Sequence, residues 1–372
     1  MADQQEPVRL RITNTAEVAQ IIPYLVGFTP EESLVIVASQ QGRVQVTARV
    51  DLQDVRSPGS AEDLLDRIWA RFPDASASVA AYTTDHRTGW SLLQRCDDWL
   101  PFGCQTMLVD GDTWHMADGT TGIIDRYGPL AAQATYHGLQ HLQSRADLKA
   151  RFTSAPDSDE LDQQLGDALA NLPAPDQAGR VLELTRELIE RNLPSATPAG
   201  HATTKPGMSA TDAIQLSILA QHPAARDLAL FSISQSNATD HLRLWQNVVR
   251  ATPAASADMP LYLAGMAAWL SGDGASATIA LERALNTAPP SSEPHPLRLL
   301  EGIIDQVVPP GAWESMRPAI LADAHPELRR ALRVDGESAS PRHGWPPVAA
   351  AASPRHRPEP DRLKPPAPGI AL

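Results

Sequence analysis

The segment from Ile21 to Leu52 constrains the fold more than any other part of the chain. It contains an uninterrupted apolar run, Leu34–Ala38, then a turn at Gln40–Arg43, then Val44–Leu52, where apolar and polar residues alternate. An uninterrupted apolar strand is typical of one that is covered on both faces, and an alternating strand is covered on one. The short loop containing Gly joins the two runs as a hairpin. This segment therefore predicts two paired strands inside a layered domain.

The first part of the chain alternates between strand and helix patterns on both sides of this hairpin. A strand is expected at 8–13, and a helix should begin at Asn14 or Thr15 and end at Gly27, a residue suited to a left-handed C-terminus. Further helices are expected at 60–72 and 88–100, a strand at 77–82, and a second hairpin at 104–116 around Asp110-Gly111-Asp112. We expect a mixed α/β sheet domain over residues 8–127.

After Pro129 the strand patterns stop and helical periodicity takes over. Residues 129–333 are predicted to be all-helical, with a flexible Pro-, Ala- and Thr-rich loop near 194–208. Residues 334–372 are rich in Pro, Ala and Arg and are predicted to be a disordered tail. The expected fold class is α+β, with a sheet domain followed by a helical domain.

One pair of predicted helices has a repeat-like pattern. Gly265, Ala267, Gly272, Ala277 and Leu281 occupy small-residue and turn positions of a tetratricopeptide-type helical hairpin. A stable array needs about three such units and only this one is clear. The helical domain is therefore expected to be either a tetratricopeptide-like array or an irregular bundle.

Composition excludes several classes of function. The chain has a net charge of −13, which argues against a dedicated nucleic-acid-binding protein because such proteins neutralise phosphates with Lys and Arg. The first residues lack the pattern of a signal peptide, and no apolar run is long enough to span a membrane. We therefore expect a cytoplasmic protein that does not enter a membrane.

The sequence contains no motif for a cofactor, a metal or a catalytic nucleophile that we can identify. It has neither a P-loop nor a G-x-G-x-x-G after a strand, and it has no G-x-S-x-G. His137 and His141 are spaced like zinc ligands, but the intervening residues lack the glutamate of a zincin. Cys96 and Cys104 do not match a zinc pattern and are expected to be buried thiols. No cofactor or metal site is predicted.

The candidate binding residues cluster around the opening segment. Glu31, Glu32 and Ser33 form the turn that leads into the apolar strand, and loops at sheet ends are common ligand sites. Arg11 and Arg49 lie on predicted strands and Asp51 ends one of them, so an Arg–carboxylate pair could form there and recognise a carboxylate or phosphate. The alternative is a structural ion pair or solvent-facing strand residues.

Several segments, taken together, resemble a bacterial family known as domain of unknown function 4192. They include Pro23–Val37, Val44–Leu52, Val109–Trp114, His241–Pro253 and Ala267–Leu285, in family order. The resemblance covers the chain from about Val8 to Trp313. It implies an architecture and no activity, because the family has none assigned.

Two functional hypotheses follow from the sequence. The first is a non-enzymatic interaction or scaffolding protein with a protein partner, because helical hairpins commonly present a concave binding surface. The alternative is a small-molecule-binding protein or enzyme, with its site at the strand ends near Arg11, Glu31, Glu32, Ser33 and Asp51.

Overall fold

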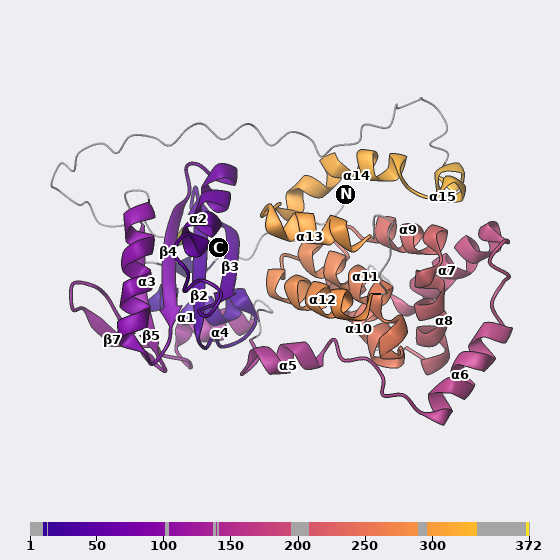
Figure 1. The fold of residues 1–372 in the computed structure, drawn as a ribbon, viewed down its shortest axis with the longest axis horizontal. Helices are drawn as coiled ribbons and strands as arrows, with labels where there is room; N and C mark the ends of the chain where they lie inside the picture. The colour runs from indigo at the N-terminus through magenta and orange to yellow at the C-terminus, as the bar shows by residue number, and fades with distance from the viewer. Residues whose placement is uncertain are drawn as a thin grey trace. The chain divides into compact units, whose positions relative to one another are not determined.

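The chain forms two compact units (Figure 1). The computed structural model describes residues 10–12, 14–100, 104–136, 139, 141–194, 208–288, 296–332 and 370–371. The first unit runs to Arg145 and also contains the described residues 370–371, and the second begins at Ala146 and contains the described residues up to 332. Most of the loop predicted near 194–208, and all but two residues of the tail predicted at 334–372, lie outside the described residues.

The first unit is built on a six-stranded sheet with the order β3-β2-β4-β5-β6-β7. Together with the helices that follow, this confirms the predicted α+β class. The strands of this sheet are β2 (Ser33–Gln40), β3 (Arg43–Asp51), β4 (Ser76–Tyr82), β5 (Gln105–Asp110), β6 (Thr113–His115) and β7 (Thr121–Ile123). A separate pair joins β1 (Arg11–Ile12) to β8 (Ile370–Ala371). The helices are α1 (Thr15–Val26), α2 (Ser60–Arg71), α3 (His86–Trp99) and α4 (Pro129–Tyr136).

The opening segment folds as its sequence predicts. The Asn14 side chain accepts a hydrogen bond from the Glu17 amide and so caps α1, which ends at Gly27 with a φ of 83°. The β2–β3 turn has positive φ at Gln41 and Gly42, 53° and 74°, as a two-residue hairpin turn of type I′ requires. Strand β2 is buried along almost its whole length between β3 and β4.

Helices cover both faces of this sheet. The Thr15 hydroxyl at the start of α1 donates to the Gln105 side chain on β5, at 3.3 Å. Gly89 of α3 packs against Leu108 of the same strand. Residues three apart on a strand point to opposite faces, so α1 and α3 lie on opposite sides of β5. Coverage on both sides explains the uninterrupted apolar run of β2.

Among the described residues of the second unit, every regular element is a helix. The longer α-helices are α6 (Asp159–Ala170), α7 (Ala178–Asn192), α8 (Ala210–Gln221), α9 (Pro223–Ser232), α10 (Ala238–Ala251), α11 (Asp258–Leu270), α12 (Gly274–Thr287), α13 (Leu297–Asp305) and α14 (Trp313–Ala322). Short α-helices are α5 (Arg145–Ala150), which spans the boundary between the units, and α15 (Pro326–Ala331). Two 3-10 turns occur at Ala254–Ser256 and Pro310–Ala312. None of the described helices has the length and apolar character needed to cross a membrane.

Helix α11 is the centre of the second unit. All 13 of its residues are buried, and α8, α9, α10, α12 and α13 all contact it. Gly265 allows the close approach, since a Cβ there would lie 2.4 Å from Leu300 on α13 and 3.4 Å from Ala280 on α12. The helices of a solenoid contact only neighbouring repeats. Four of these five helices, α9, α10, α12 and α13, lie within two helices of α11 along the chain, as in a stack of helical hairpins, and α8 lies further away. The choice between a tetratricopeptide-like array and an irregular bundle therefore stays a prediction, and the α11–α12 hairpin has the local features of a tetratricopeptide unit.

The helix predicted after Pro129 is interrupted. It forms as α4 and α5, and between them Leu142 pairs with the opening segment. The Leu142 amide donates to the Gly27 carbonyl at 2.8 Å, and the Thr29 amide donates to the Leu142 carbonyl at 3.0 Å. These backbone bonds replace helical ones, so tertiary pairing overrides the local preference for helix.

Candidate functional site at the carboxyl edge of the sheet

Strand directions bring the ends of β3, β4 and β5 to one edge of the sheet. Strand β2 is antiparallel to both β3 and β4, and β4 is parallel to β5, so β3, β4 and β5 run the same way. Their last residues, Asp51, Tyr82 and Asp110, therefore lie at the edge where β2 starts with Ser33. We call this the carboxyl edge. Ligands of open α/β sheets bind outside the carboxyl ends of strands.

Four of the five residues predicted from the sequence lie at the carboxyl edge, and the structure gives three of them defined partners. Ser33 is buried and its hydroxyl donates to the Glu31 carbonyl. The Glu32 carboxylate accepts from the Thr83 hydroxyl at 2.8 Å, and the Glu32 carbonyl accepts from the Leu52 amide at 2.9 Å. These bonds tie the turn before β2 to the ends of β3 and β4.

Of the two arginines that the sequence offers for an Arg–carboxylate pair, Arg49 forms one. Arg49 and Asp51, two residues apart on β3, make an ion pair of 2.7 Å, and the Arg49 guanidinium lies 5.7 Å from the centre of the Phe28 ring. Arg11 lies on β1, outside the six-stranded sheet, and its side chain is outside the described residues. Whether Glu31, Glu32, Ser33 and Asp51 bind a ligand stays a prediction.

Helix α3 begins at the carboxyl edge, and polar and charged side chains lie along two of its sides. The Asp85 side chain caps it by accepting from the Thr88 amide, at 3.2 Å, and from the Thr88 hydroxyl, at 2.6 Å. These hydrogen bonds lower the pKa of the Asp85 carboxyl. Gly89 faces the sheet, where a Cβ would lie 2.7 Å from Leu108 and 2.9 Å from Thr83. The glycine lets α3 lie close to the sheet, with one cavity on each side of its first turns.

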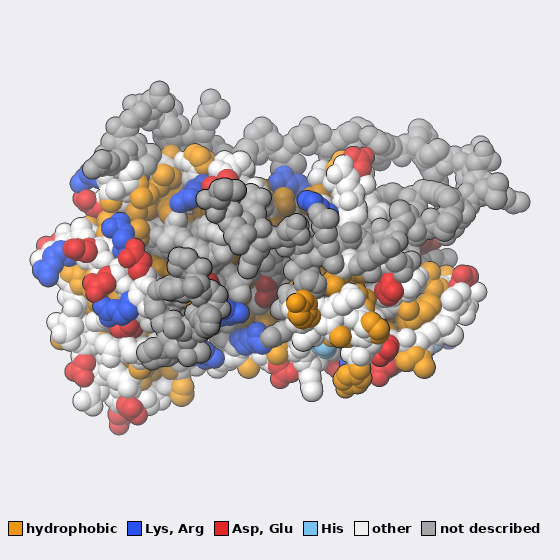
Figure 2. All heavy atoms as spheres, turned by 180° about the vertical axis from the view of Figure 1, so that it is seen from behind, with side chains coloured by type: hydrophobic (Ala, Val, Ile, Leu, Met, Phe, Trp, Pro, Cys, Tyr) orange, Lys and Arg blue, Asp and Glu red, His pale blue; other side chains and the backbone are white. Residues whose placement is uncertain are grey.

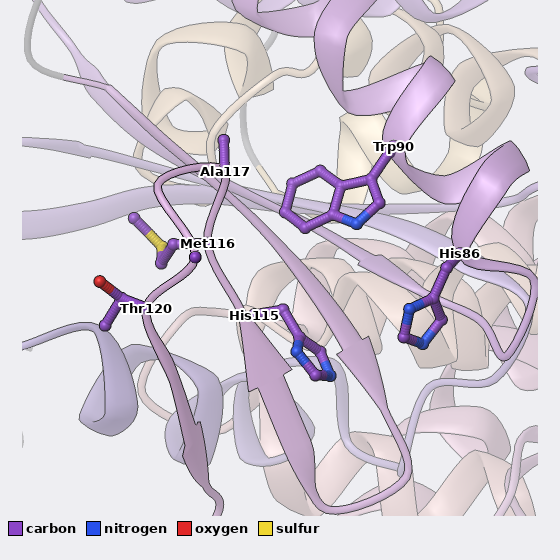
Figure 3. Close-up of a pocket in the computed structure, with 7 residues that line it drawn as sticks. His86, Trp90, His115, Met116, Ala117 and Thr120 are labelled. Carbon is purple, nitrogen blue, oxygen red and sulfur yellow. The ribbon is translucent and has the colours of Figure 1, made fainter.

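The first cavity, which we call the histidine cavity, has a volume of about 450 Å³ (Figure 3). His86 and Trp90, one turn apart on α3, face His115 at the end of β6 and the loop that leads to β7. The two histidine rings lie 5.2 Å apart, centre to centre. The cavity is lined by His86, Trp90, His115, Met116, Ala117, Gly119 and Thr120.

Neighbouring groups orient both histidines. His86 Nε2 lies 3.0 Å from the Asp110 carboxylate, which can only accept a hydrogen bond when ionised, so Nε2 carries a proton. The Thr121 hydroxyl donates to the Trp114 carbonyl at 2.9 Å and lies 3.3 Å from His115 Nδ1. The proton of the Thr121 hydroxyl is thus already used, so His115 Nδ1 must be the donor in its hydrogen bond with this hydroxyl. A neutral ring then keeps one acceptor nitrogen, Nδ1 in His86 and Nε2 in His115.

The second cavity, which we call the arginine cavity, has a volume of about 270 Å³. It lies between α3 and the segment that follows β3. Its lining residues are Leu52, Val55, Arg56, Arg87, Thr88, Ser91, Leu92 and Arg95.

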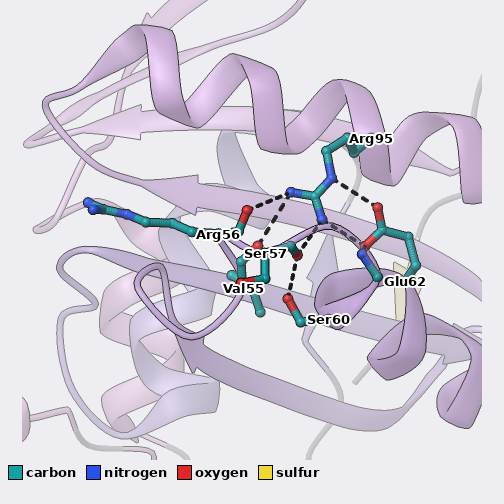
Figure 4. A network of polar contacts seen from close by, with 7 residues as sticks. Val55, Arg56, Ser57, Ser60, Glu62 and Arg95 are labelled. Carbon is teal, nitrogen blue, oxygen red and sulfur yellow. Dashed lines mark hydrogen bonds and ion pairs between the residues drawn. The ribbon is translucent and has the colours of Figure 1, made fainter.

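Arg95 joins the two walls of the arginine cavity (Figure 4). Its guanidinium binds both carboxylate oxygens of Glu62, at 2.9 and 2.8 Å, and donates to the Ser57 carbonyl at 3.0 Å. Arg95 lowers the pKa of the Glu62 carboxyl, chiefly through this hydrogen bond. Glu62 also accepts from the Gly59 amide at the start of α2, at 3.1 Å. Gly59 is thus the N-cap residue of α2, directly before the first helical residue, Ser60.

Among the described residues, neither the two cysteines nor the acidic side chains form a further candidate for a reactive or metal-binding site. Burial raises the pKa of the Cys96 thiol to about 12 and also raises that of Cys104, which accepts a hydrogen bond from the Ala77 amide. Such thiols are unreactive, because the thiolate is the nucleophile. Across the described ranges, no three or more His, Cys, Asp and Glu residues are placed to hold a metal ion.

The described side chains on the face that Figure 2 shows give no support for nucleic-acid binding. Basic and acidic side chains of the described residues are interspersed there, and neither sign forms a continuous band. Binding of a phosphate backbone depends on several Lys and Arg side chains acting together.

Sequence reasoning missed the residues of both cavities. Asp110 ends one predicted strand, and Asp85 and His86 follow another, so the rule of carboxyl ends could have selected all three. Applying that rule requires the order of the strands in the sheet, which the sequence alone does not show. The pairing of His86 with Asp110 spans 24 positions and leaves no local pattern.

Comparison with known proteins gives a family and no activity. A family model described as a domain of unknown function, DUF4192, matches residues 16–310. The chain belongs to this family. No curated protein and no solved structure matches it. The DUF4192 match covers the sheet unit together with most of the described helices, so the family comprises both units.

Proposed function

We propose that this DUF4192 protein binds a small molecule in the histidine cavity of its sheet unit. The observation that carries the proposal is the convergence of two oriented histidines and Trp90 on a cavity of about 450 Å³ at the carboxyl edge. Binding cavities are typically concave, partly apolar and furnished with a few placed polar groups.

The geometry also suggests the chemistry of the ligand. His86 and His115 each offer an acceptor nitrogen when neutral, so a ligand with at least two hydrogen-bond donors complements them. Trp90 and Met116 supply apolar surface, and an indole favours stacking with a flat group. Nucleosides, nucleobases and sugars have this combination of donors and a flat or apolar face.

A thermal-shift screen of nucleosides, nucleobases, sugars and metabolites on the full chain tests the proposal. We expect a compound that raises the melting temperature of the wild type and that loses this effect in His86→Gln and His115→Gln. Glu31→Gln, an exposed residue at the same edge, is the matched control and should keep the effect. If Glu32→Gln or Asp51→Asn abolishes the shift while both histidine variants retain it, the site predicted from the sequence replaces the histidine cavity.

A protein partner is the second candidate, and one feature of the sheet unit favours it. Ile123 on the edge strand β7 is 77% exposed, and Tyr127, shortly after it, is 95% exposed. Exposed aromatic and apolar side chains beside a strand edge are typical of interaction sites. We place the binding of a partner at this edge because both exposed side chains lie on or directly after β7.

Affinity capture separates these two candidates. A partner retained near stoichiometrically by the wild type should be lost by the double variant Ile123→Ser, Tyr127→Ser. Equal retention by both baits contradicts a role for the β7 edge. We place either activity in the cytoplasm, in keeping with the free thiols Cys96 and Cys104, because a reducing compartment keeps thiols unpaired.

A further inference from the structure

Two exposed arginines give the arginine cavity positive charge that no described residue pairs with. Two of its three arginines, Arg56 and Arg87, make no hydrogen bond or ion pair through their guanidinium groups with any described residue, whereas Arg95 is fully engaged by Glu62 and backbone carbonyls. In Figure 4 the Arg56 side chain extends away from the Arg95 network. In a chain with a net charge of −13, two unpaired guanidinium groups on one cavity make it a local attractor for anions.

The remaining groups of this cavity define what could fill it. Leu52, Val55 and Leu92 are buried and give it an apolar floor. The Ser91 hydroxyl has no partner among the described residues, whereas the Thr88 hydroxyl is committed to Asp85. A ligand would therefore meet guanidinium forks and one hydroxyl above an apolar surface. Such forks match the planar geometry of a carboxylate or the oxygens of a phosphate.

Charge balance distinguishes between these two anions. Arg95 and Glu62 cancel each other, so Arg56 and Arg87 contribute two positive charges. The hydrogen bonds from Thr88 chiefly lower the pKa of the Asp85 carboxyl, and the positive charge of Arg56 adds a smaller effect in the same direction, so Asp85 offsets part of the charge of the cavity. The net local charge is therefore one positive unit, which a monoanion neutralises and a phosphate dianion exceeds.

We infer that the arginine cavity binds a small organic carboxylate, with the carboxylate between Arg56 and Arg87 and the apolar part over Leu52, Val55 and Leu92. Ser91 would donate to the same carboxylate. This site is on the other side of α3 from the histidine cavity and does not depend on it.

Titration calorimetry of the full chain with benzoate tests this inference, because benzoate joins one carboxylate to a small apolar ring. We expect a Kd on the order of 1 mM, as befits so small a ligand. Arg87→Gln and Arg56→Gln should each weaken binding about tenfold, since each removes a charge-assisted hydrogen bond. Arg71→Gln removes the same charge from an exposed site on α2 and should leave the affinity unchanged.

Two further ligands and one more variant test whether binding requires both the carboxylate and this cavity. Benzamide, the uncharged analogue, should not bind detectably, and His86→Gln should bind benzoate as the wild type does. The inference is overturned if benzoate fails to bind at about ten times the expected Kd, if benzamide binds equally well, or if Arg71→Gln weakens binding as much as Arg87→Gln does. Tighter binding of inorganic phosphate than of benzoate would overturn the assignment to carboxylates.

Discussion

Acid should destabilise the helical unit through one buried histidine. His241 on α10 is fully buried, and neither of its ring nitrogens makes a hydrogen bond to a described residue. Burial lowers the pKa of His241 from its ordinary 6.5 to about 4, and the Ser232 carbonyl, which already accepts from Asn237, opposes this shift only in part. The unfolded chain therefore binds a proton at a pH where the folded chain does not.

The sign and size of the effect follow from this difference in pKa. Where the unfolded state binds more protons, the free energy of unfolding falls as the pH falls. The loss begins below about pH 6.5 and is complete below about pH 4, where it amounts to about 3 kcal/mol. Between about pH 7.5 and about pH 5 the expected loss from His241 alone is about 2 kcal/mol.

Urea denaturation followed by the helical circular dichroism signal measures this loss in the wild type and in His241→Leu. The leucine variant removes the titrating ring and both unpaired nitrogens, so its free energy of unfolding at neutral pH should lie within about 1 kcal/mol of the wild type. Over the same pH interval it should lose about 2 kcal/mol less than the wild type. If both proteins lose the same amount, His241 is not the source and its ring is not buried in the neutral form.

Three further substitutions test other parts of the structure. Arg95→Met should lower the free energy of unfolding by about 2 kcal/mol, because it leaves Glu62, only 15% exposed, without its partner; a loss under about 0.5 kcal/mol in thermal unfolding would contradict this. Gly265→Ala should cost about 1–2 kcal/mol by overpacking against Leu300, and the cost should shrink in a Leu300→Ala background, which a double-mutant cycle measures. Asp273 caps α12, and burial raises the pKa of its carboxyl. The folded state therefore holds the proton more tightly than the unfolded state, so the contribution of Asp273 to the free energy of unfolding falls as the pH rises above the ordinary Asp range. Asp273→Asn should therefore keep or raise the melting temperature at neutral pH, whereas Asp273→Ala should cost about 1 kcal/mol.

Local signals explain why much of the fold was predictable. The cap at Asn14, the left-handed Gly27 and the apolar run of β2 each act over a few residues, and the helix and strand that they predict formed as α1 and β2. The break between α4 and α5 was not predictable, because Leu142 leaves the helical pattern to pair with Gly27 and Thr29, more than a hundred positions away. Contacts of that range override local propensity and leave no periodic trace in the sequence.

The candidate site was predictable only to the level of the sheet edge. Glu31, Glu32 and Ser33 lie at the carboxyl edge because the start of β2 sits between the ends of β3 and β4, as an antiparallel neighbour must. The partners of Glu32 and Ser33 turned out to be Thr83 and a local carbonyl, which explains much of their presence structurally. The two cavities depend on where α3 lies over the sheet, and helical periodicity alone does not determine that position.

The burial of α11 has a consequence for how the helical unit unfolds. In an array of repeats, terminal units can melt separately because each contacts only its neighbours. Here helices that precede α11 and helices that follow it along the chain all pack against the same 13 residues of α11. Losing any one of these helices therefore exposes apolar surface that the other helices also contact. The described helices around α11 should consequently melt in a single cooperative transition, and a fragment that ends after α12 should aggregate because it lacks the cover that α13 gives to α11.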